Sequence, residues 1–386
     1  MFFKLIKDFN KKFQSKIKHT DEIELVLDNC NIPNSGLRYL AQIPFTFLKK
    51  LILSNNNISN IGTIIPSNFN FDNLEILSFE QNHIKDLSIL TKANFKKLKL
   101  LNLDHNNLSD MKIFSQIKLP ILETLILNGN QISDLTFLTE MSFYYLKELI
   151  LSRNTIKNID ILEKIKIDSL EVLDLSVNKI EDIKVFEKVM FKNLRELNLY
   201  FNRFTDIIPL EKANLEKLEK LNLNDNKLTN VEFLEKANFS QLKKLYLHST
   251  NENQEIQMPL FNNFKKLEIL DLSECNIYEI KEYQDETEKP ILANLKILNL
   301  SSNSIEDLNF LKNLDLKELK ELDLNCNQIS EMTVFKEIHF WNLDKLDIRY
   351  NKIDLEDEED AAIINHLRFK IKELKYKEEE EKEKEE

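Results

Sequence analysis

One spacing of residues recurs along almost the whole chain. In residues 146–156, Leu occupies the first, fourth and sixth positions, Asn the ninth and Ile the eleventh. The same L-x-x-L-x-L-x-x-N-x-I spacing returns at residues 122–132 and 170–180. A fixed period of about 20–50 residues is the mark of a repeat architecture. We therefore expect one elongated array of similar modules, in which each module packs only on its neighbours.

Each module has one residue at the ninth motif position, and counting these residues gives about fourteen consecutive modules. The position is filled by Cys30, Asn56, Asn82, Asn106, Asn130, Asn154, Asn178, Asn202, Asn226, Thr250, Cys275, Asn303, Asn327 and Asn351.

Each module predicts a short strand followed by a turn. Leu149 and Leu151 alternate in a strand, so both point inward. Successive strands stack in parallel, and Asn154 follows where the chain bends and leaves backbone groups unpaired. Stacking aligns these amides in a ladder, where Cys or Thr can serve as a weaker donor. The regular part of this ladder comprises Asn106, Asn130, Asn154, Asn178, Asn202 and Asn226.

The outer half of each module is also patterned. An acidic residue precedes an apolar one, as in Asp134-Leu135, and such an Asp can cap a short helix or 3₁₀ turn. The same arrangement is found at Asp86, Asp110, Asp182, Asp206 and Asp307. Bulky apolar residues, often Phe, precede the first Leu of each module by three positions, so most of the 25 Phe are expected to fill the core.

The two ends depart from the repeat. Residues 1–20 predict an amphipathic helix, with Phe2, Ile6, Phe9, Phe13 and Ile17 on one side and Lys on the other. We favour a cap on the first module, with a membrane-surface or targeting helix as the alternative.

At the other end, residues 355–386 predict a second cap, a helix over Ala361–Tyr376, followed by a solvated Glu/Lys tail.

The repeat is irregular between Thr250 and Pro290. A polar run, Asn251 to Gln257, replaces the expected N-x-I, and the next module has a longer acidic segment, Tyr283 to Pro290. The two interpretations are surface loops tolerated by the fold and a docking feature or bend.

Composition excludes several functions. A formal net charge of -12 disfavours nucleic acid or an anionic membrane as the main partner. Three scattered Gly cannot form a phosphate-binding loop. The chain has no C-x-x-C, H-E-x-x-H or G-x-S-x-G motif, and its six His are scattered. We expect no catalytic residues, no metal and no cofactor.

The three Cys fall too far apart in the array for disulfides, which suggests a reducing compartment.

The side of the strands that faces away from the core is the remaining candidate for function. The third, fifth, seventh and eighth motif positions should lie there, and most carry small or charged side chains. Exposed aromatics beside Arg are typical anchors of a protein interface. Three adjacent modules provide a candidate protein-binding surface of this kind: Tyr200, Phe201, Arg203, Asn222, Asn224, Asp225, Tyr246 and His248.

Two further features of this side bear on the partner. Arg349 and Tyr350 form a weaker candidate site in the last module. Asp at the fifth position would make the side acidic and suited to a basic partner. These residues are Asp174, Asp271, Asp323 and Asp347.

Over residues 21–354 the chain resembles the leucine-rich repeat family, because the aligned L-x-x-L-x-L-x-x-N-x-I modules carry its motif. The Asn-x-Ile-x-Asp segment is similar to intracellular phosphatase-1 regulatory subunits and to bacterial internalins. This resemblance implies an α/β repeat fold, a right-handed solenoid with a curved parallel sheet on its concave side and short helices or 3₁₀ turns on its convex side. It also implies a protein partner bound on the concave face.

Three roles agree with this resemblance. The first is a monomeric cytoplasmic scaffold or adaptor that binds a protein without catalysis. The second is a regulatory subunit of an enzyme such as a protein phosphatase, or a substrate-recognition component. The third is a membrane-associated protein recruited by the helix of residues 1–20.

Overall fold

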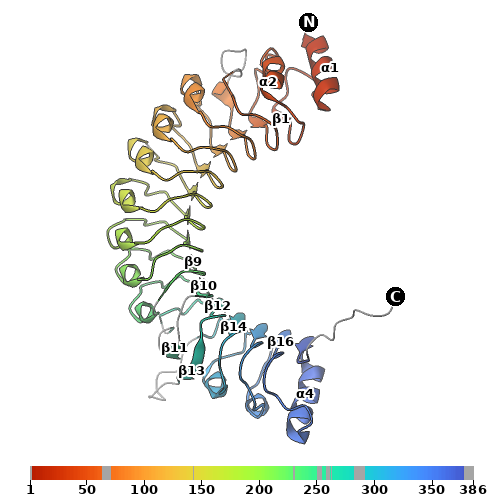
Figure 1. The fold of residues 1–386 in the computed structure, drawn as a ribbon, viewed down its shortest axis with the longest axis vertical. Coiled ribbons are helices and arrows are strands. Elements are labelled where there is room, and N and C mark those ends of the chain that lie inside the picture. Colours follow the sequence, from red (N-terminus) through yellow and green to blue (C-terminus); the bar gives the residue numbers. More distant parts are fainter. Residues whose placement is uncertain are drawn as a thin grey trace. The chain divides into compact units, whose positions relative to one another are not determined.

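The computed structural model describes residues 2–62, 71–141, 143–228, 231–249, 254–257, 261, 263–281 and 292–377. The chain forms two compact units, unit 1 (Met1–Leu194) and unit 2 (Arg195–Glu386). In each unit, short strands lie side by side, and helical turns lie on the opposite side of the modules (Figure 1). The predicted α/β repeat with a parallel sheet is confirmed.

Unit 1 alternates strands with helical turns. Its strands are β1 (Glu24–Val26), β2 (Lys50–Ile52), β3 (Ile76–Ser78), β4 (Leu100–Asn102), β5 (Thr124–Ile126), β6 (Glu148–Ile150) and β7 (Val172–Asp174). Its helices are α1 (Phe2–Phe13), α2 (Asn34–Leu40) and the 3₁₀ helices η1 (Phe71–Asn73), η2 (Ser88–Lys92), η3 (Lys112–Gln116), η4 (Thr136–Glu140), η5 (Asp160–Lys164) and η6 (Lys184–Glu187).

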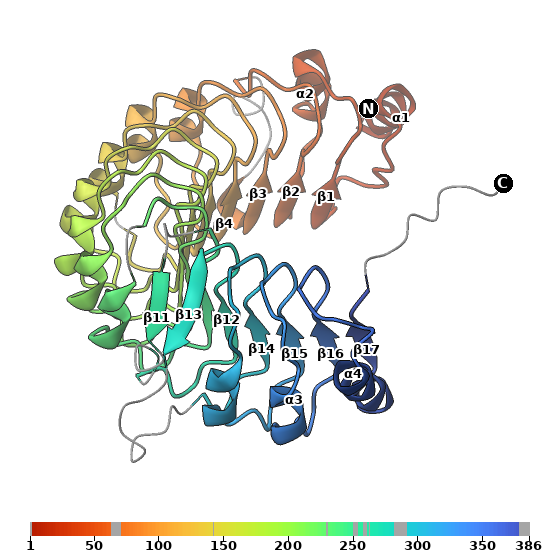
Figure 2. The ribbon, with the colours of Figure 1, turned by 60° about the horizontal axis from the view of Figure 1, so that its bottom comes forward.

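Unit 2 repeats this plan with one addition. Its main strands are β8 (Glu196–Asn198), β9 (Lys220–Asn222), β10 (Lys244–Tyr246), β12 (Ile269–Asp271), β14 (Ile297–Asn299), β15 (Glu321–Asp323), β16 (Lys345–Asp347) and β17 (Glu373–Lys375). Its helices are η7 (Ile208–Glu211), η8 (Glu232–Glu235), η10 (Asn309–Asn313), α3 (Val334–Glu337) and α4 (Glu358–Lys370). The addition is a separate parallel pair, β11 (Gln254–Gln257) with β13 (Ile277–Lys281) (Figure 2).

Strand register keeps equivalent motif positions opposite each other. Leu149 in β6 pairs with Leu125 in β5 and with Leu173 in β7, and all three side chains are fully buried. Because neighbours in a strand point to opposite sides, the third and fifth positions lie on the side away from the core. We call this side the strand face.

Buried asparagines close each module. The Asn154 Nδ2 group donates to the carbonyl oxygens of Leu127, Leu151 and Ser152 at 3.0–3.1 Å. Its Oδ1 atom accepts from the Ile132 N–H at 3.0 Å. One side chain therefore satisfies backbone groups of two modules that water cannot reach.

Asn106, Asn130 and Asn178 make the same four bonds. Asn226 makes the three donated bonds, but its Oδ1 atom accepts from the Asn202 N–H at 3.2 Å, and Asn202 Nδ2 donates to the carbonyls of Leu199 and Tyr200. Cys275 takes the same place with a thiol. Its Sγ atom donates to the Leu247 carbonyl at 2.9 Å and the Ser273 carbonyl at 3.2 Å. Thr250 lies outside the described residues.

The predicted Asp residues do bond to the start of each helical turn, but from one position before the N-cap residue, which is Leu135 in η4. The Asp134 Oδ1 atom accepts from the N–H of Thr136, the first residue of η4, at 2.8 Å. The same bond to the residue two positions on is made by Asp86, Asp110, Asp182, Asp206 and Asp307.

The residue at the eighth motif position has a left-handed backbone conformation, which the sequence pattern did not predict. Val177 has φ +51° and Phe201 has φ +53°, in a region that bulky L-residues rarely occupy. The conformation recurs at every eighth position among the described residues from Asn29 to Tyr350. The turn therefore depends on the repeat rather than on residue type.

The structure corrects three boundaries. The first helix ends at Phe13 rather than near residue 20. The helix predicted over 361–376 instead spans Glu358–Lys370, because Asp357 caps its start and the chain then forms β17 beside β16. Part of the irregular polar run, Gln254–Gln257, is strand rather than loop.

Several predicted segments lie outside the described residues: the part of the polar run before Gln254, the whole acidic segment from Tyr283 to Pro290, and the tail after Lys377.

Candidate interaction surface

The predicted surface residues belong to three adjacent modules of unit 2. Strand β9 pairs in parallel with β8 on one side and with β10 on the other. In these strands Leu197, Leu221 and Leu245 point into the core. Motif positions three and five therefore reach the strand face, and the seventh and eighth positions follow at the ends of the strands.

Tyr200 and Phe201 form an aromatic pair just after β8. Their ring centroids lie 5.9 Å apart, with the ring planes tilted by 50°. Phe201 is 54% exposed, whereas Tyr200 is half-buried. Phe201 also has a left-handed backbone, which costs a bulky residue about 1–2 kcal/mol. An exposed aromatic at a strained position is a reason to suspect a functional role.

Arg203 does not complete an aromatic–cation cluster. It is exposed, two residues beyond Phe201, and among the described residues it forms no ion pair and no cation–π contact. Arg203 was predicted to stand beside the aromatic pair, but it makes no cation–π contact with Tyr200 or Phe201. Its guanidinium charge remains accessible.

The three polar residues of the next module connect the strands. Asn222 Oδ1 accepts from the Asn224 N–H at 3.1 Å, which fixes the turn after β9. Asn224 Oδ1 accepts from the His248 N–H at 2.8 Å and so reaches the next module. Asp225 is half-buried, has φ +53°, and its N–H donates to the His248 carbonyl at 2.9 Å. These residues hold the surface in shape as well as lining it.

Tyr246 lies at the fifth position of β10, directly between Asn222 and Asp271 on the neighbouring strands. Partial burial raises the pKa of its hydroxyl above the ordinary value of 10.0; Lys220 opposes this increase, and the carboxylates of Asp271 and Glu196 add to it. The side chain is therefore a neutral, half-buried aromatic with a polar end.

His248 is held in place by the following module. Its Nδ1 atom lies 2.8 Å from Ser273 Oγ, which donates its own proton to Asp271 Oδ1 at 2.6 Å. Ser273 Oγ can then accept from an Nδ1–H group. The Nε2 atom lies 3.8 Å from Glu274 Oε2, an ion pair that requires the protonated ring. The imidazole is thus oriented with its Nε2 edge toward a carboxylate.

The surface is divided into two aromatic groups. Tyr200 contacts Phe201, whereas no ring contact in the described part of the chain joins either of them to Tyr246. Tyr246 and His248 lie two modules further on, at roughly 10 Å if strands are spaced by about 4.8 Å. Aromatic anchors with polar groups beside them are typical of protein interfaces.

The acidic residues of the fifth position are less available than predicted. Asp347 is buried and forms two hydrogen bonds with the Arg349 guanidinium, at 2.7 and 3.0 Å. Asp174, Asp271 and Asp323 each accept a backbone N–H two residues on. Their first role is to fix the turn after the strand, because Asp and Asn side chains make such local bonds readily.

The weaker candidate in the last module is an ordered pair. The Arg349 guanidinium lies 5.9 Å from the ring centroid of Tyr350, which is 50% exposed. Since Asp347 neutralises this Arg, the module presents mainly an aromatic surface.

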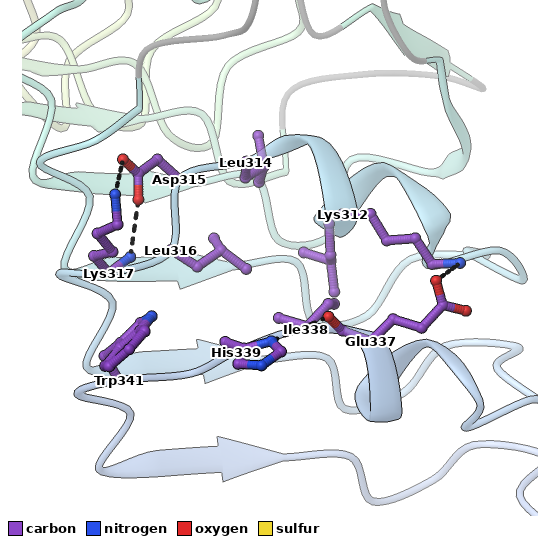
Figure 3. A pocket seen from close by; sticks show the side chains of 10 residues that line it. Lys312, Leu314, Asp315, Leu316, Lys317, Glu337, Ile338, His339 and Trp341 are labelled. Atoms are coloured by element: carbon purple, nitrogen blue, oxygen red, sulfur yellow. Dashed lines mark hydrogen bonds and ion pairs between the residues drawn. The ribbon is translucent and has the colours of Figure 1, made fainter.

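A concavity that the sequence analysis missed lies beside the chain's one Trp (Figure 3). It has a volume of about 250 Å³ and lies between the turn at Leu314 and the segment from Glu337 to Trp341. Its charges pair with one another: Lys312 with Glu337 at 2.9 Å and Lys317 with Asp315 at 3.2 Å. With its charges so paired, the pocket offers little to orient a charged ligand. The single Trp of the sequence, Trp341, lies at the rim of this pocket and is 70% exposed, so it is the residue that could have indicated the pocket from the sequence.

We also searched the described residues for metal sites and for membrane-spanning helices. These residues include no group of three or more His, Cys, Asp or Glu arranged to hold a metal ion. No helix within them has the length and apolar character needed to cross a lipid bilayer.

Comparison with known proteins identifies the repeat. A family model described as Leucine Rich repeats (2 copies) matches residues 146–188, 192–236 and 293–337. No curated protein matches the sequence.

Solved structures share the fold. An internalin from Listeria monocytogenes is 23% identical, with 98% of this chain and 94% of that chain covered and a TM-score of 0.63. A leucine-rich repeat protein from Leptospira interrogans is 22% identical, with 97% and 86% covered and a TM-score of 0.68. A domain of a second L. monocytogenes internalin, which includes a cysteine ladder, is 21% identical, with 89% and 71% covered and a TM-score of 0.56. At these identities the likeness establishes the fold alone.

Proposed function

Because the chain is a leucine-rich repeat protein, we propose that it binds a partner protein through the strand face of β8, β9 and β10. The observation that carries this proposal is Phe201, which is 54% exposed in a left-handed backbone and stands beside Tyr200. Such a residue costs stability and is retained more readily if it contributes to binding.

The partner contacts the two aromatic groups as anchors and the strip of Asn222, Asn224 and Asp225 as hydrogen-bonding groups. Aromatic side chains supply most of the binding free energy at such surfaces, and polar neighbours fix the orientation. Asp225, Glu274 and the other acids of this face favour a partner with basic residues, whereas Arg203 favours one acidic contact.

We infer a scaffold or adaptor role without catalysis. No disulfide joins the three cysteines, all of which lie in the described part of the chain, and free thiols agree with a reducing compartment such as the cytoplasm. We further propose that α1 and α4 cap the two ends of the repeat array and that the protein acts as a monomer.

The test compares partner capture by the wild-type chain and by a Tyr200→Ala, Phe201→Ala, Tyr246→Ala variant. A matched control, Tyr144→Ala with Tyr145→Ala, removes aromatics that are 76% and 56% exposed in unit 1. Proteins from the native cell are identified by quantitative mass spectrometry, and binding of the purified partner is measured by calorimetry. We expect the triple variant to weaken binding at least about a hundredfold and the control to leave it unchanged.

Circular dichroism and thermal unfolding establish that each variant is folded. If the folded triple variant captures every partner as well as the wild type does, the proposed surface is not the binding site.

A further inference from the structure

Unit 1 carries a second feature on its own strand face, a row of aliphatic side chains. One half-buried aliphatic residue lies at the third or fifth motif position of each of six consecutive modules, β2 to β7. In β5, Thr124 at the third position adds its methyl group. The row consists of Ile52, Ile76, Leu100, Ile126, Ile150 and Val172. None of these residues belongs to the core, because the intervening fourth position of each strand is the buried one.

The register of the strands gives the row a central part of two direct pairs, whereas Ile52 lies opposite Ser78 and Val172 opposite Glu148, so these two end residues neighbour the row only diagonally. Ile76 lies directly opposite Leu100, and Ile126 lies directly opposite Ile150. Thr124, the cross-strand neighbour of Leu100, links the two pairs. Strands β2, β3 and β4 of this row lie side by side in Figure 2. A contiguous apolar surface that faces away from the core usually marks a binding site.

Carboxylates border the row. Glu80 accepts from Asn102 Nδ2 at 3.1 Å and Glu148 accepts from Thr124 Oγ1 at 3.4 Å, and neither these two nor Asp174 forms an ion pair within 4.0 Å among the described residues. Lys50, the base at one end of the row, is paired with Glu24 at 3.4 Å. The border therefore attracts a positively charged partner.

The geometry selects a helix over a strand as the occupant. Parallel strands are spaced by about 4.8 Å, and a helix advances about 5.4 Å per turn. A helix laid across the strands can therefore place one apolar side chain near each strand. An extended segment repeats its side chains on one face every 6.6–6.8 Å or so, which loses register with the row. Six strands span about 24 Å, the length of a helix of about 16 residues.

We propose that the strand face of β2 to β7 binds a basic amphipathic helix of a partner protein, with its aliphatic stripe on the row and its Lys or Arg residues beside Glu80, Glu148 and Asp174. This site belongs to unit 1 and is independent of the aromatic surface of unit 2.

The experiment uses the full chain and a synthetic helical peptide of about 16 residues, in which Leu recurs every three or four positions among Lys and Ala. Two comparison peptides have the same length: an isomer of the same composition with Leu at alternate positions, and a version with Glu in place of Lys. Binding is measured by fluorescence anisotropy, and bound helicity by circular dichroism. We expect the helical basic peptide to bind at least about tenfold more tightly than either comparison peptide.

Two variants locate the site. Ile126→Asn with Ile150→Asn removes the central apolar pair and should weaken binding about tenfold or more. Glu148→Gln with Asp174→Asn should weaken binding several-fold and reduce its salt dependence. Asn at position 174 keeps the acceptor for the Ser176 N–H, since Asn102 makes the same bond to Asp104. Ile297→Asn, a half-buried aliphatic at the third position in unit 2, is the matched control.

Equal binding of the helical and alternating peptides, equal binding of the Glu peptide, or an unchanged affinity in the folded Ile126→Asn, Ile150→Asn variant would each overturn the proposal, as would no binding of the helical peptide. If that variant does not fold, Ile76→Asn with Leu100→Asn tests the same row. Retained peptide binding in the Tyr200→Ala, Phe201→Ala, Tyr246→Ala variant is expected, which separates this site from the aromatic surface.

Discussion

The ladder asparagines explain why each module can bend without leaving backbone groups unsatisfied. Asn154 makes three donated bonds and accepts one, and it is only 7% exposed. A buried amide in this position serves two consecutive modules, so its contribution is structural and local.

Asn154→Ala should therefore destabilise unit 1 by about 2–4 kcal/mol, because it leaves buried carbonyls and one N–H unpaired. The free energy of unfolding in urea measures the effect. Lys157→Ala, an exposed residue of the same module, is the control and should change it by less than about 0.5 kcal/mol. An Asn154→Ala protein as stable as this control would show that water replaces the amide.

A substitution at Phe201 should change stability and partner binding in opposite directions. Asn tolerates a left-handed backbone better than Phe does, so Phe201→Asn should raise the stability of unit 2 by about 0.5–1 kcal/mol. The same change should weaken partner binding, because it removes the exposed ring. Thermal unfolding and calorimetry measure the two effects.

Val177→Asn, which relieves the same strain in unit 1, is the control for Phe201→Asn. It should raise stability and leave binding at the aromatic surface unchanged. If Phe201→Asn also left binding unchanged, the ring would have no role in recognition.

At the scale of strands, a row of alternating charges at the second motif position aligns neighbouring modules. In unit 1 it reads Lys49, Glu75, Lys99, Glu123, Lys147 and Glu171. Across the sheet, the Glu75 carboxylate pairs with the Lys49 ammonium at 3.6 Å and with the Lys99 ammonium at 3.3 Å. A strand paired out of order would bring like charges together, so the alternation favours the correct neighbour.

In unit 2, Glu219 is the residue through which the contribution of these alternating charges to stability can be tested. It pairs with Arg195 at 3.0 Å and with Lys243 at 2.7 Å, and the hydrogen bond from Lys243 holds the pKa of its carboxyl below the ordinary value of 4.5. A lowered pKa in the folded state adds stability above about the ordinary value, and this stability is lost as pH falls through the lowered pKa.

Glu219→Gln should thus cost less than about 1 kcal/mol at pH near 7, and the difference from wild type should vanish in acid. Urea unfolding across the acidic range measures it. Glu216→Gln, an exposed residue of the same module, should show no such pH dependence. A difference that persists at the lowest pH would mean that packing, not charge, is responsible.

The terminal helix α1 has its apolar stripe covered. Ile6, Phe9 and Phe13 of α1, and Ile17 in the segment after it, are all at most 5% exposed, although Phe3 is 75% exposed. A membrane-surface helix needs such a stripe to be free for lipid. We therefore expect that the intact chain does not float with vesicles containing anionic lipid, and that deleting residues 1–20 causes aggregation by uncovering the first module. Flotation of the intact chain would favour the membrane role instead.

At the scale of the molecule, the fold was predictable because it repeats. The spacing of Leu149, Leu151 and Asn154 fixes a strand, its inward face and its turn, and repetition fixes the parallel sheet. The strand at Glu373–Lys375 was not predicted, since Ile371 and Leu374 fit a helical stripe as well as a strand. The pairing of β11 with β13 depends on contacts between separate modules, which local patterns do not reveal.

The candidate surface was predictable only in part. The strand face follows from alternation, and the aromatic side chains of Tyr200 and Tyr246 are visible in the sequence. The strained backbone of Phe201 was not visible, because residues as different as Val and Asn occupy the same position. The bond from Asn224 to the His248 N–H also escaped prediction, since it joins two modules.

Hydroxyl-radical footprinting of the complex with its partner tests the central claim, recognition on the strand face of unit 2, most directly. The account predicts that oxidation of Tyr200, Phe201 and Tyr246 falls several-fold on binding, while Tyr144 and Trp341 react as in the free protein. Protection of Tyr144 or Trp341 with unchanged oxidation at Phe201 would contradict it.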